Sequence, residues 1–319
     1  MKTTRISMKN LALTSTAIVL AAATGYAQAQ AFRCPRMGGD LIYALESKVP
    51  GLDQHTSNAG ATRNVALNIY ESLVTRDEAM NPVLELAETM TVSPDGKTYT
   101  FKLRQGIQFH NGKTMTSADV IASFDRYKRV GVDRSILDPV DKWTTPDANT
   151  FVITLKEARP LFIEALSSFT VPIVIVPAEN AQAPAQQLPV VGTGPFKLEE
   201  FRADSFVKLR RFDGYKPDTR HNQMTGYAGN KRACVDTVTF RMMTEPAART
   251  AALEVGEIHA VEDVPAASQK RLRDNKAIKL ERLETFWMNV AYPNFSNPPT
   301  DNPKVRQACL LYTSPSPRD

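Results

Sequence analysis

The feature that most constrains the fold of this chain is a succession of turn, strand and capped helix between residues 93 and 127. Residues 93–96 are Ser-Pro-Asp-Gly, which is typical of a tight turn because proline supplies the φ of its second position and glycine ends it. Apolar and polar residues then alternate over 98–104, which predicts a strand with one buried face. Thr116 is expected to cap a helix, with Asp119 as its capping-box partner. The middle of the chain is therefore expected to be a compact α+β unit.

The remaining segments predict further short elements, and the later half has an α/β pattern. Strands are expected at 41–45, 151–155, 196–201 with 206–212 as a hairpin, 235–242, 258–261 and 278–283. Helices are expected at 63–73, 160–166, 245–256 and 265–272. The continuous apolar run 41–45 predicts a strand in a sheet that is covered on both faces.

The N-terminus has the pattern of a secretory signal peptide, which we expect to span residues 1–31. Basic residues precede the apolar run 11–23, and small residues with Ala-Gln-Ala repeats follow it. The run is shorter than the ~20 residues that a membrane-spanning helix needs. Cleavage is expected after Ala29 or Ala31, which predicts a soluble mature chain in the periplasm.

Charge and composition narrow the class of protein. Without the signal the formal net charge falls from +5 to about +2, and no basic stripe alternates with aromatic residues, so nucleic acid is not an expected partner. The 42% of hydrophobic residues is enough for a sizeable core. At about 100 to 200 residues per domain, the mature length predicts two units.

The three cysteines are Cys34, Cys234 and Cys309, so at most one intramolecular pair can form in an oxidising compartment. Cys34 with Cys234 is the favoured pair, and two unpaired thiols are the alternative. A lipid anchor on Cys34 is not expected, because the bulky residues Phe32 and Arg33 precede it.

No motif in the sequence predicts catalysis, a metal or a cofactor. The four histidines share no metal-ligand spacing, and Cys-x-x-Cys, His-Glu-x-x-His and Gly-x-Ser-x-Gly are absent. Residues 192–195 are Gly-Thr-Gly-Pro, but a strand rather than a helix is expected after them, which argues against a phosphate-binding loop. The two glycines are expected to adopt unusual φ values. His110, beside a turn, is expected to cap or bridge that turn.

Residues 93–112, together with the helix 116–126, closely resemble the signature of the bacterial extracellular solute-binding proteins of family 5. This family includes dipeptide-, oligopeptide- and nickel-binding proteins. The similarity extends to 191–196, 248–257 and 302–308. The resemblance implies an α/β fold of the type II periplasmic binding protein kind, in which two lobes close on a ligand by a hinge motion.

The resemblance also implies a domain organisation. Lobe I would have its main subdomain, a mixed sheet with helices, at 32–58 and 190–285, and an inserted α+β subdomain at 59–189. Residues 286–308 would be the hinge and the start of lobe II, which is otherwise missing. Residues 309–319 are similar to translated sequencing-adaptor read-through.

The implied function is that of the periplasmic substrate-binding component of an ABC importer. Such a protein captures a peptide or similar small solute and delivers it to an inner-membrane permease and ATPase complex. A monomer without enzymatic activity is expected. A secreted hydrolase that depends on His55 or Glu262 is an alternative, and a fragment that binds nothing is another.

Eight residues are candidates for the ligand cleft. They follow the first strand, lie in an acidic loop, or lie beside the hinge: Asp53, His55 and Asn58; Glu262 and Asp263; Phe286, Trp287 and Asn289. A purely structural role is the alternative for each of them.

Overall fold

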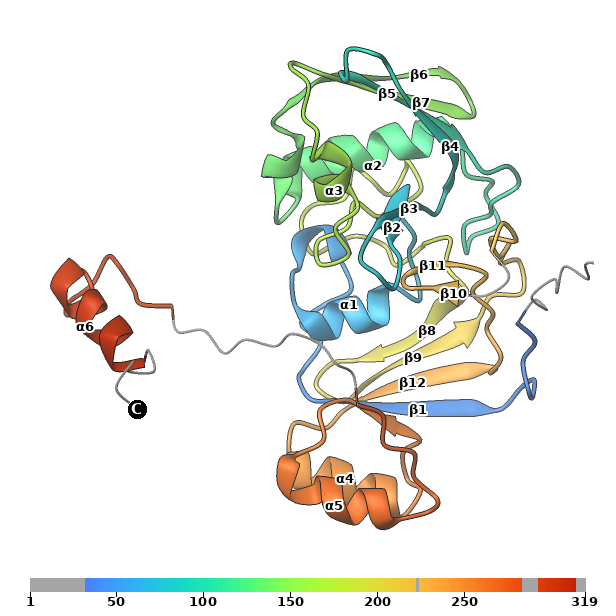
Figure 1. Ribbon diagram of the computed structural model, residues 1–319. Coiled ribbons are helices and arrows are strands. Elements are labelled where there is room, and N and C mark those ends of the chain that lie inside the picture. Colours follow the sequence, from blue (N-terminus) through green and yellow to red (C-terminus); the bar gives the residue numbers. More distant parts are fainter. Residues whose placement is uncertain (1–31, 222–223, 283–291, 314–319) are drawn as a thin grey trace, which may run out of the picture. The chain divides into compact units, whose positions relative to one another are not determined.

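The computed structural model describes residues 32–221, 224–282 and 292–313, without the side chains of 310–313 (Figure 1). The chain separates into two units, Met1–Pro265 and Ala266–Asp319. The expected signal peptide and three of the candidate residues, Phe286, Trp287 and Asn289, lie outside the described residues. Within the described residues, no helix is long and apolar enough to cross a membrane.

The first unit contains a five-stranded mixed sheet, hereafter the main sheet. Its strands, in order across the sheet, are β13 (Ala260–Val261), β1 (Asp40–Leu45), β12 (Thr237–Met242), β9 (Phe206–Arg211) and β8 (Phe196–Arg202). β1 runs parallel to both of its neighbours, whereas β12, β9 and β8 pair antiparallel. The helix α4 (Pro246–Glu254) connects β12 to β13, with proline at its first position. The expected α/β class is confirmed.

A second sheet is four-stranded and antiparallel throughout. Its strands, in order, are β4 (Ala87–Val92), β5 (Thr98–Leu103), β7 (Thr150–Leu155) and β6 (Val140–Asp147). The helix α2 (Ser117–Val130) packs against β6 and β7. Its first turn is fixed by the carboxylate of Asp119, which accepts hydrogen bonds from the N–H of Thr116 at 2.9 Å and from its hydroxyl at 3.1 Å. The expected capping residues are therefore the ones that begin this helix.

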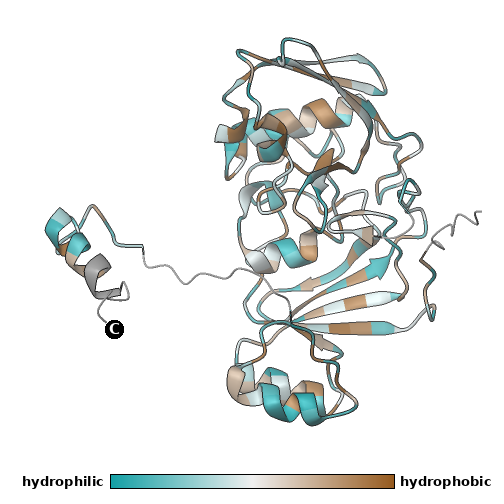
Figure 2. Cartoon of the chain, viewed as in Figure 1, coloured by the Kyte–Doolittle hydropathy of each residue, from teal (hydrophilic) through white to brown (hydrophobic). Residues whose placement is uncertain are grey.

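Smaller elements complete the first unit. They are the hairpin β2 (Val74–Arg76) with β3 (Pro82–Leu84), the hairpin β10 (Met224–Thr225) with β11 (Ala228–Gly229), the helices α1 (Gly60–Ala66) and α3 (Phe162–Leu166), and the 3-10 turns η1 (Gln54–Thr56) and η2 (Arg134–Leu137). The second unit contains α5 (Ala266–Asp274) and α6 (Pro303–Thr313). In Figure 2 the strands of both sheets carry hydrophobic and hydrophilic residues along their length.

The two sheets have separate hydrophobic cores, and these divide later in the chain than we expected. Ala61, Val65 and Tyr70 lie in the core of the main sheet, although they fall in the segment expected as an insertion. The core of the second sheet begins at Leu73. The helix α1 therefore packs on the main sheet, as Figure 1 also shows.

The expected helix over 63–73 is wrong in its length, because α1 ends at Ala66. The carbonyl of Asn68 accepts a hydrogen bond from the N–H of Phe196, and that of Ile69 accepts one from the N–H of Gly194. These carbonyls bond to a distant segment of the chain instead of to the next helical turn. Residues 278–282 contain no strand, contrary to expectation.

Candidate functional site

The first unit contains a cavity of about 760 Å³. Its walls come from β1, α1, β12, the segment 195–196, the segment 224–235 and the loop after β13. Most of the lining is apolar or aromatic: Leu41, Tyr43, Phe196, Tyr227, Val238 and Phe240. A concave, largely apolar site with a few polar groups is the usual form of a small-molecule binding site.

The floor of the cavity follows from the alternation of side chains along two parallel strands. Leu41 is opposite Val238 and Tyr43 is opposite Phe240, so these four side chains share one face of the main sheet. The rings of Tyr43 and Phe240 have their centres 5.7 Å apart. The expectation that β1 is covered on both faces is wrong at its start, because Leu41 and Tyr43 are half-buried and line the cavity.

Glu262 is the one predicted cleft residue, among those the structure describes, that lines the cavity. Its Oε2 accepts hydrogen bonds from the hydroxyl of Tyr43 at 3.2 Å and from Nδ2 of Asn64 at 2.9 Å. Burial, and then the charge of Glu262, raise the pKa of Tyr43, which keeps this hydroxyl a donor. Asp263 is exposed, has a φ of 51° and does not line the cavity.

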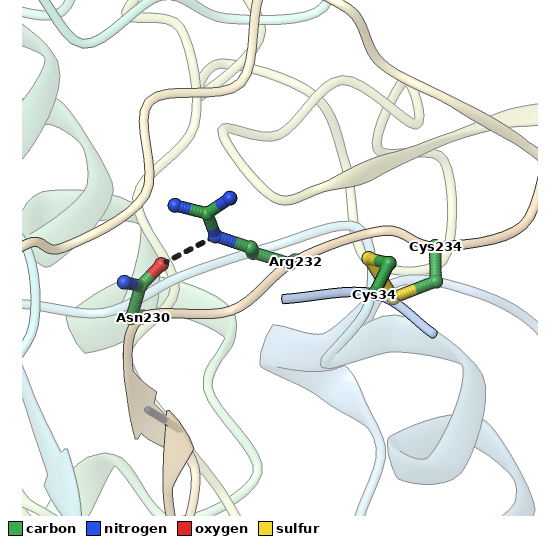
Figure 3. Close-up of a disulfide and its surroundings, with 4 residues drawn as sticks. All are labelled: Cys34, Asn230, Arg232 and Cys234. Atoms are coloured by element: carbon green, nitrogen blue, oxygen red, sulfur yellow. Dashed lines mark hydrogen bonds between the residues drawn. A yellow bond between two sulfur atoms is a disulfide. The ribbon is translucent and has the colours of Figure 1, made fainter. Parts of the chain in front are cut away.

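Three basic residues, Arg63, Lys231 and Arg232, also line the cavity. The Nζ of Lys231 lies 2.5 Å from Oε1 of Glu85, which is outside the cavity. The Nε of Arg232 donates to Oδ1 of Asn230 at 3.4 Å (Figure 3). The guanidinium carbon of Arg63 lies 5.4 Å from the centre of the Phe169 ring.

A disulfide between Cys34 and Cys234, the pair favoured from the sequence, lies at the wall of the cavity (Figure 3). The two Cα atoms are 5.4 Å apart and the cysteines are 200 residues apart in sequence. The N–H of Gly38 also donates to the carbonyl of Cys234 at 2.8 Å. The segment that carries Lys231 and Arg232 is thus fixed to the start of β1.

Asp53 and His55 are buried in the interior and do not line the cavity. Asp53 forms a two-point ion pair with Arg126 of α2. His55 bonds through Nε2 to the carbonyl of Val174 at 2.8 Å, and burial lowers its pKa to about 4. Asn58 is exposed and also lies away from the cavity. In the described structure Asp53 and His55 bond to distant parts of the fold, and a role of the segment after β1 in a ligand cleft stays a prediction.

His110 bridges a turn to a distant segment, as expected from its position. Its Nε2 lies 3.0 Å from the carbonyl of Gly194, and its Nδ1 accepts from the N–H of Gly192 at 3.3 Å. Burial lowers the pKa of His110 to about 4. These partners fix a neutral ring with its proton on Nε2.

The glycines of the Gly-Thr-Gly-Pro segment are needed for close packing rather than for an unusual φ. A Cβ on Gly192 would lie 2.1 Å from the carbonyl oxygen of Ile69, and one on Gly194 would lie 2.6 Å from that of Asn68. Neither glycine is among the residues with positive φ, so the expectation of an unusual φ is wrong. The segment passes so close to the end of α1 that no side chain fits.

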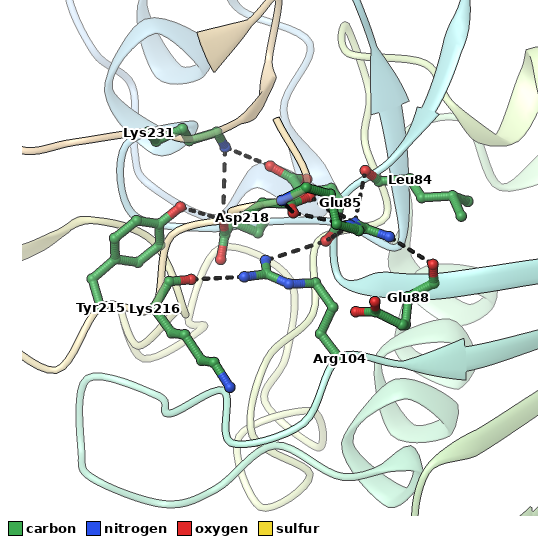
Figure 4. Close-up of polar contacts among 10 residues, drawn as sticks. Leu84, Glu85, Glu88, Arg104, Tyr215, Lys216, Asp218 and Lys231 are labelled. Carbon is green, nitrogen blue, oxygen red and sulfur yellow. Dashed lines mark hydrogen bonds and ion pairs between the residues drawn. The ribbon is translucent and has the colours of Figure 1, made fainter. Parts of the chain in front are cut away.

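A buried charge network that the sequence did not reveal adjoins the cavity through Lys231 (Figure 4). Lys231 lies between Glu85 and Glu71, with 3.8 Å from its Nζ to Oε1 of Glu71. The hydroxyl of Tyr215 donates to the same Oε1 at 3.0 Å. Burial raises the pKa of Glu71 to about 7, against the opposing charge of Lys231. Because the members are far apart in sequence and follow no motif, no local signal could have found them.

Comparison with known proteins decides the family. The model of the bacterial extracellular solute-binding proteins, family 5 (middle region), matches residues 81–312. The chain belongs to this family.

Among curated family 5 relatives, the glutathione-binding protein GsiB of Escherichia coli K12 is 31% identical over 294 residues. That match covers 90% of this chain and 54% of the relative, so the chain spans about half the length of the curated relatives it matches. The GsiB protein of Shigella boydii serotype 4 is also 31% identical over the same length.

Solved structures of similar proteins agree with this family 5 assignment. The binding protein AgaA from A. tumefaciens R10, in complex with agropinic acid, is 31% identical, with a TM-score of 0.64 over 75% of this chain and 46% of AgaA. The binding protein MoaA from the same strain, in complex with mannopinic acid, is 25% identical, with a TM-score of 0.73 over 85% of this chain and 54% of MoaA. Within the described part of this family 5 chain, no group of three or more acidic, histidine or cysteine side chains could hold a metal ion.

Proposed function

We propose that this chain forms the first lobe of a periplasmic solute receptor, which captures a peptide or similar small solute for an ABC importer. The observation that carries the proposal is the cavity of about 760 Å³ between the main sheet, α1 and the segment 224–235, which has the size of a small-molecule site. Tyr43, Phe240 and Tyr227 give it apolar contact area. Glu262 and the arginines give it a few charged groups that can orient a solute.

The second wall of the site belongs, in this proposal, to the part of the relatives that the chain does not span. A solute that contacts both walls favours the closed arrangement over the open one, so capture is a shift in population. A permease and ATPase complex would then read the closed form. An inserted subdomain within lobe I and the hinge at 286–308 remain part of the proposal, with α1 assigned to the main subdomain.

The disulfide between Cys34 and Cys234 supports an oxidising compartment, and residues 1–31 have the pattern of an export signal. We therefore assign the protein to the periplasm. A hydrolase that depends on His55 gains no support, because this ring is neutral, buried and bonded to a backbone carbonyl.

The experiment is a thermal-shift screen of the complete gene product against small peptides, glutathione, opine-like amino acid conjugates, sugars and nickel complexes. A solute that binds the folded state raises the midpoint of unfolding by mass action. We expect one chemical class to raise it, and Phe240→Ala to weaken that response more than a substitution outside the cavity, such as Phe201→Ala. A screen without any response would overturn the receptor function, and turnover of a peptide in the same samples would favour the hydrolase. The 319-residue chain, screened in parallel, tests whether a fragment can bind.

A further inference from the structure

The segment 224–235 forms one wall of the cavity and is fixed near both of its ends. Near its start, the N–H of Tyr227 donates to the carbonyl of Arg76 at 2.9 Å, and near its end the disulfide holds Cys234. Between these two points the side chain of Lys231 enters the interior, where it is 11% exposed. The position of the middle of this wall therefore depends on the groups that Lys231 meets there.

Lys231 meets two carboxyl groups that are themselves buried. Its Nζ lies 2.5 Å from Oε1 of Glu85 and 3.8 Å from Oε1 of Glu71, and these two side chains are 5% and 2% exposed. The other oxygen of Glu85 accepts from the N–H of Ser72 at 2.7 Å and from its hydroxyl at 3.1 Å. Glu85 therefore has partners for both oxygens and matches the charge of Lys231 by itself.

Glu71 has hydrogen-bond partners that suit both of its protonation states. Its Oε1 accepts from the hydroxyl of Tyr215 at 3.0 Å. The hydroxyl of Thr193 lies close to the same carboxyl group, and among the described residues neither this hydroxyl nor Oε2 of Glu71 has another partner. A threonine hydroxyl can donate to a carboxylate or accept from a carboxyl group. Thr193 is brought here by the N–H of Gly194, which bonds to the carbonyl of Ile69.

The ionisable groups that face Glu71 come from separate elements. They are Lys231 of the wall, Glu85 after β3, Arg104 after β5, and Tyr215. Burial raises the pKa of Glu71 to about 7 against the charge of Lys231, and the charge of Glu85 adds to the rise. Arg104 donates to the carbonyls of Glu85 and Lys216, at 3.3 and 2.8 Å, rather than to a carboxylate. Burial is thus the largest influence, and water that enters when the wall is displaced removes it.

We propose that Glu71 is a positioning residue, whose protonated form keeps Lys231 and the wall 224–235 in place, so that solute binding weakens as the pH rises. The inference rests on the proposed function and adds to it the regulation of the site by pH. A protonated Glu71 leaves one buried carboxylate for one buried ammonium group, whereas an ionised Glu71 places a second negative charge beside Glu85. The wall in place therefore binds more protons than the displaced wall, so protons favour it.

Hydrogen–deuterium exchange of the complete gene product tests the wall without any solute. We expect the protection of residues 224–235, corrected for the intrinsic pH dependence of exchange, to fall about tenfold or more between pH 5 and pH 8. Glu71→Gln removes this fall. Tyr215→Phe moves it to higher pH, because the ionised carboxyl group loses a donor. Glu88→Gln, at an exposed position, keeps the wild-type profile.

The second measurement is the affinity for a solute found by the thermal-shift screen, determined by isothermal titration calorimetry at pH 5 and pH 7.5. The wild type should bind about tenfold more weakly at the higher pH. In buffers of different ionisation enthalpy, it should take up protons on binding between these values. The solute's own titration is common to wild type and Glu71→Gln, so the difference between their profiles reports Glu71.

The outcomes separate this inference from the receptor function. If wild-type protection or affinity does not change with pH, or if Glu71→Gln changes in the same way, Glu71 does not position the wall and the receptor function stands. If no solute of the screen binds the wild type at either pH, the receptor function falls, and regulation of the site by pH falls with it whatever the exchange shows.

Discussion

Arg126 and Asp53 join the two cores of the first unit through a buried, two-point ion pair. Nη1 of Arg126 donates to Oδ1 of Asp53 at 3.0 Å, and Nη2 donates to Oδ2 at 2.6 Å. The same Oδ2 accepts from the N–H of Gln186 at 2.9 Å, and Nη2 also donates to the carbonyl of Pro184 at 3.0 Å. The helix of the second sheet, the segment after β1 and the connector near 184–186 therefore meet at one point.

Asp53→Ala is expected to destabilise the chain strongly, because it leaves the guanidinium of Arg126 buried without its counter-charge. Loss of one partner of a buried pair costs about 3 to 5 kcal/mol. Lys48→Ala, which breaks the exposed pair with Asp204, is expected to cost less than about 1 kcal/mol. Urea unfolding followed by circular dichroism measures both. Equal effects of the two substitutions would contradict a central role for the buried pair.

Glu71 is expected to make stability fall as the pH rises from about 4.5 to about 7. Its pKa in the folded chain is raised to about 7, from an ordinary value of 4.5, mainly by burial. Between these values the folded chain keeps a proton that the unfolded chain has released, so the free energy of unfolding decreases with pH.

Glu71→Gln is uncharged at every pH and removes this decrease. The midpoint of thermal unfolding of the variant, relative to wild type, should therefore rise between pH 5 and pH 8. Glu88→Gln, a change of the same kind at an exposed position, should show no such trend. A constant difference for Glu71→Gln across this range would show that Glu71 is ionised throughout.

The double variant Cys34→Ser/Cys234→Ser is expected to lose about 2 to 5 kcal/mol of unfolding free energy. The disulfide closes a loop of 200 residues, and a longer loop restricts the unfolded chain more. Cys309→Ser, which leaves this disulfide intact, should change stability by less than about 0.5 kcal/mol. Adding a reductant should lower the unfolding midpoint of the wild type and leave that of the double variant unchanged. A reductant effect in the double variant would point to another cause.

Gly192→Ala is expected to destabilise the chain by about 3 kcal/mol, the upper end for an overpacked site. The new methyl group would overlap the carbonyl oxygen of Ile69, and backbone cannot move aside as a flexible side chain can. Gly51→Ala is the control, because nothing lies within 4 Å of its added Cβ. Chemical denaturation compares the two, and equal midpoints would contradict the close approach.

Many of the short strands and helices were predictable because the residue patterns that specify them lie within a few positions of one another. Alternating residues and turn motifs gave β5, β7 and the hairpin β8 with β9, and the capping residues gave the start of α2. The strands β4 and β6 were missed because their burial is irregular, with most of their residues exposed or half-buried. The early end of α1 depends on hydrogen bonds from Gly194 and Phe196, more than a hundred residues away.

The candidate site was predictable only in part, because most of its residues come from segments that are distant in sequence. Glu262 was found because it follows a short strand, and strand ends often carry functional groups. Asn64, Arg63 and Arg232 were missed, because α1 and the segment 224–235 meet only in the folded chain. Asp53 was chosen because it follows the first strand, and the sequence could not show that its partner is Arg126, 73 positions later.

The position of β1 between β12 and β13 in the main sheet has a consequence for the order of assembly. Its two partner strands lie at 237–242 and 260–261, so β1 has no ladder to join until most of the first unit has been synthesised. The strands β4 to β7, in contrast, all lie within residues 87–155 and can pair with one another early. Contacts between residues distant in sequence form slowly because a long loop must first close. The strand β1 is therefore the first strand of the unit to be synthesised and among the last to be paired. The floor of the cavity, which includes β1, forms only at that late stage.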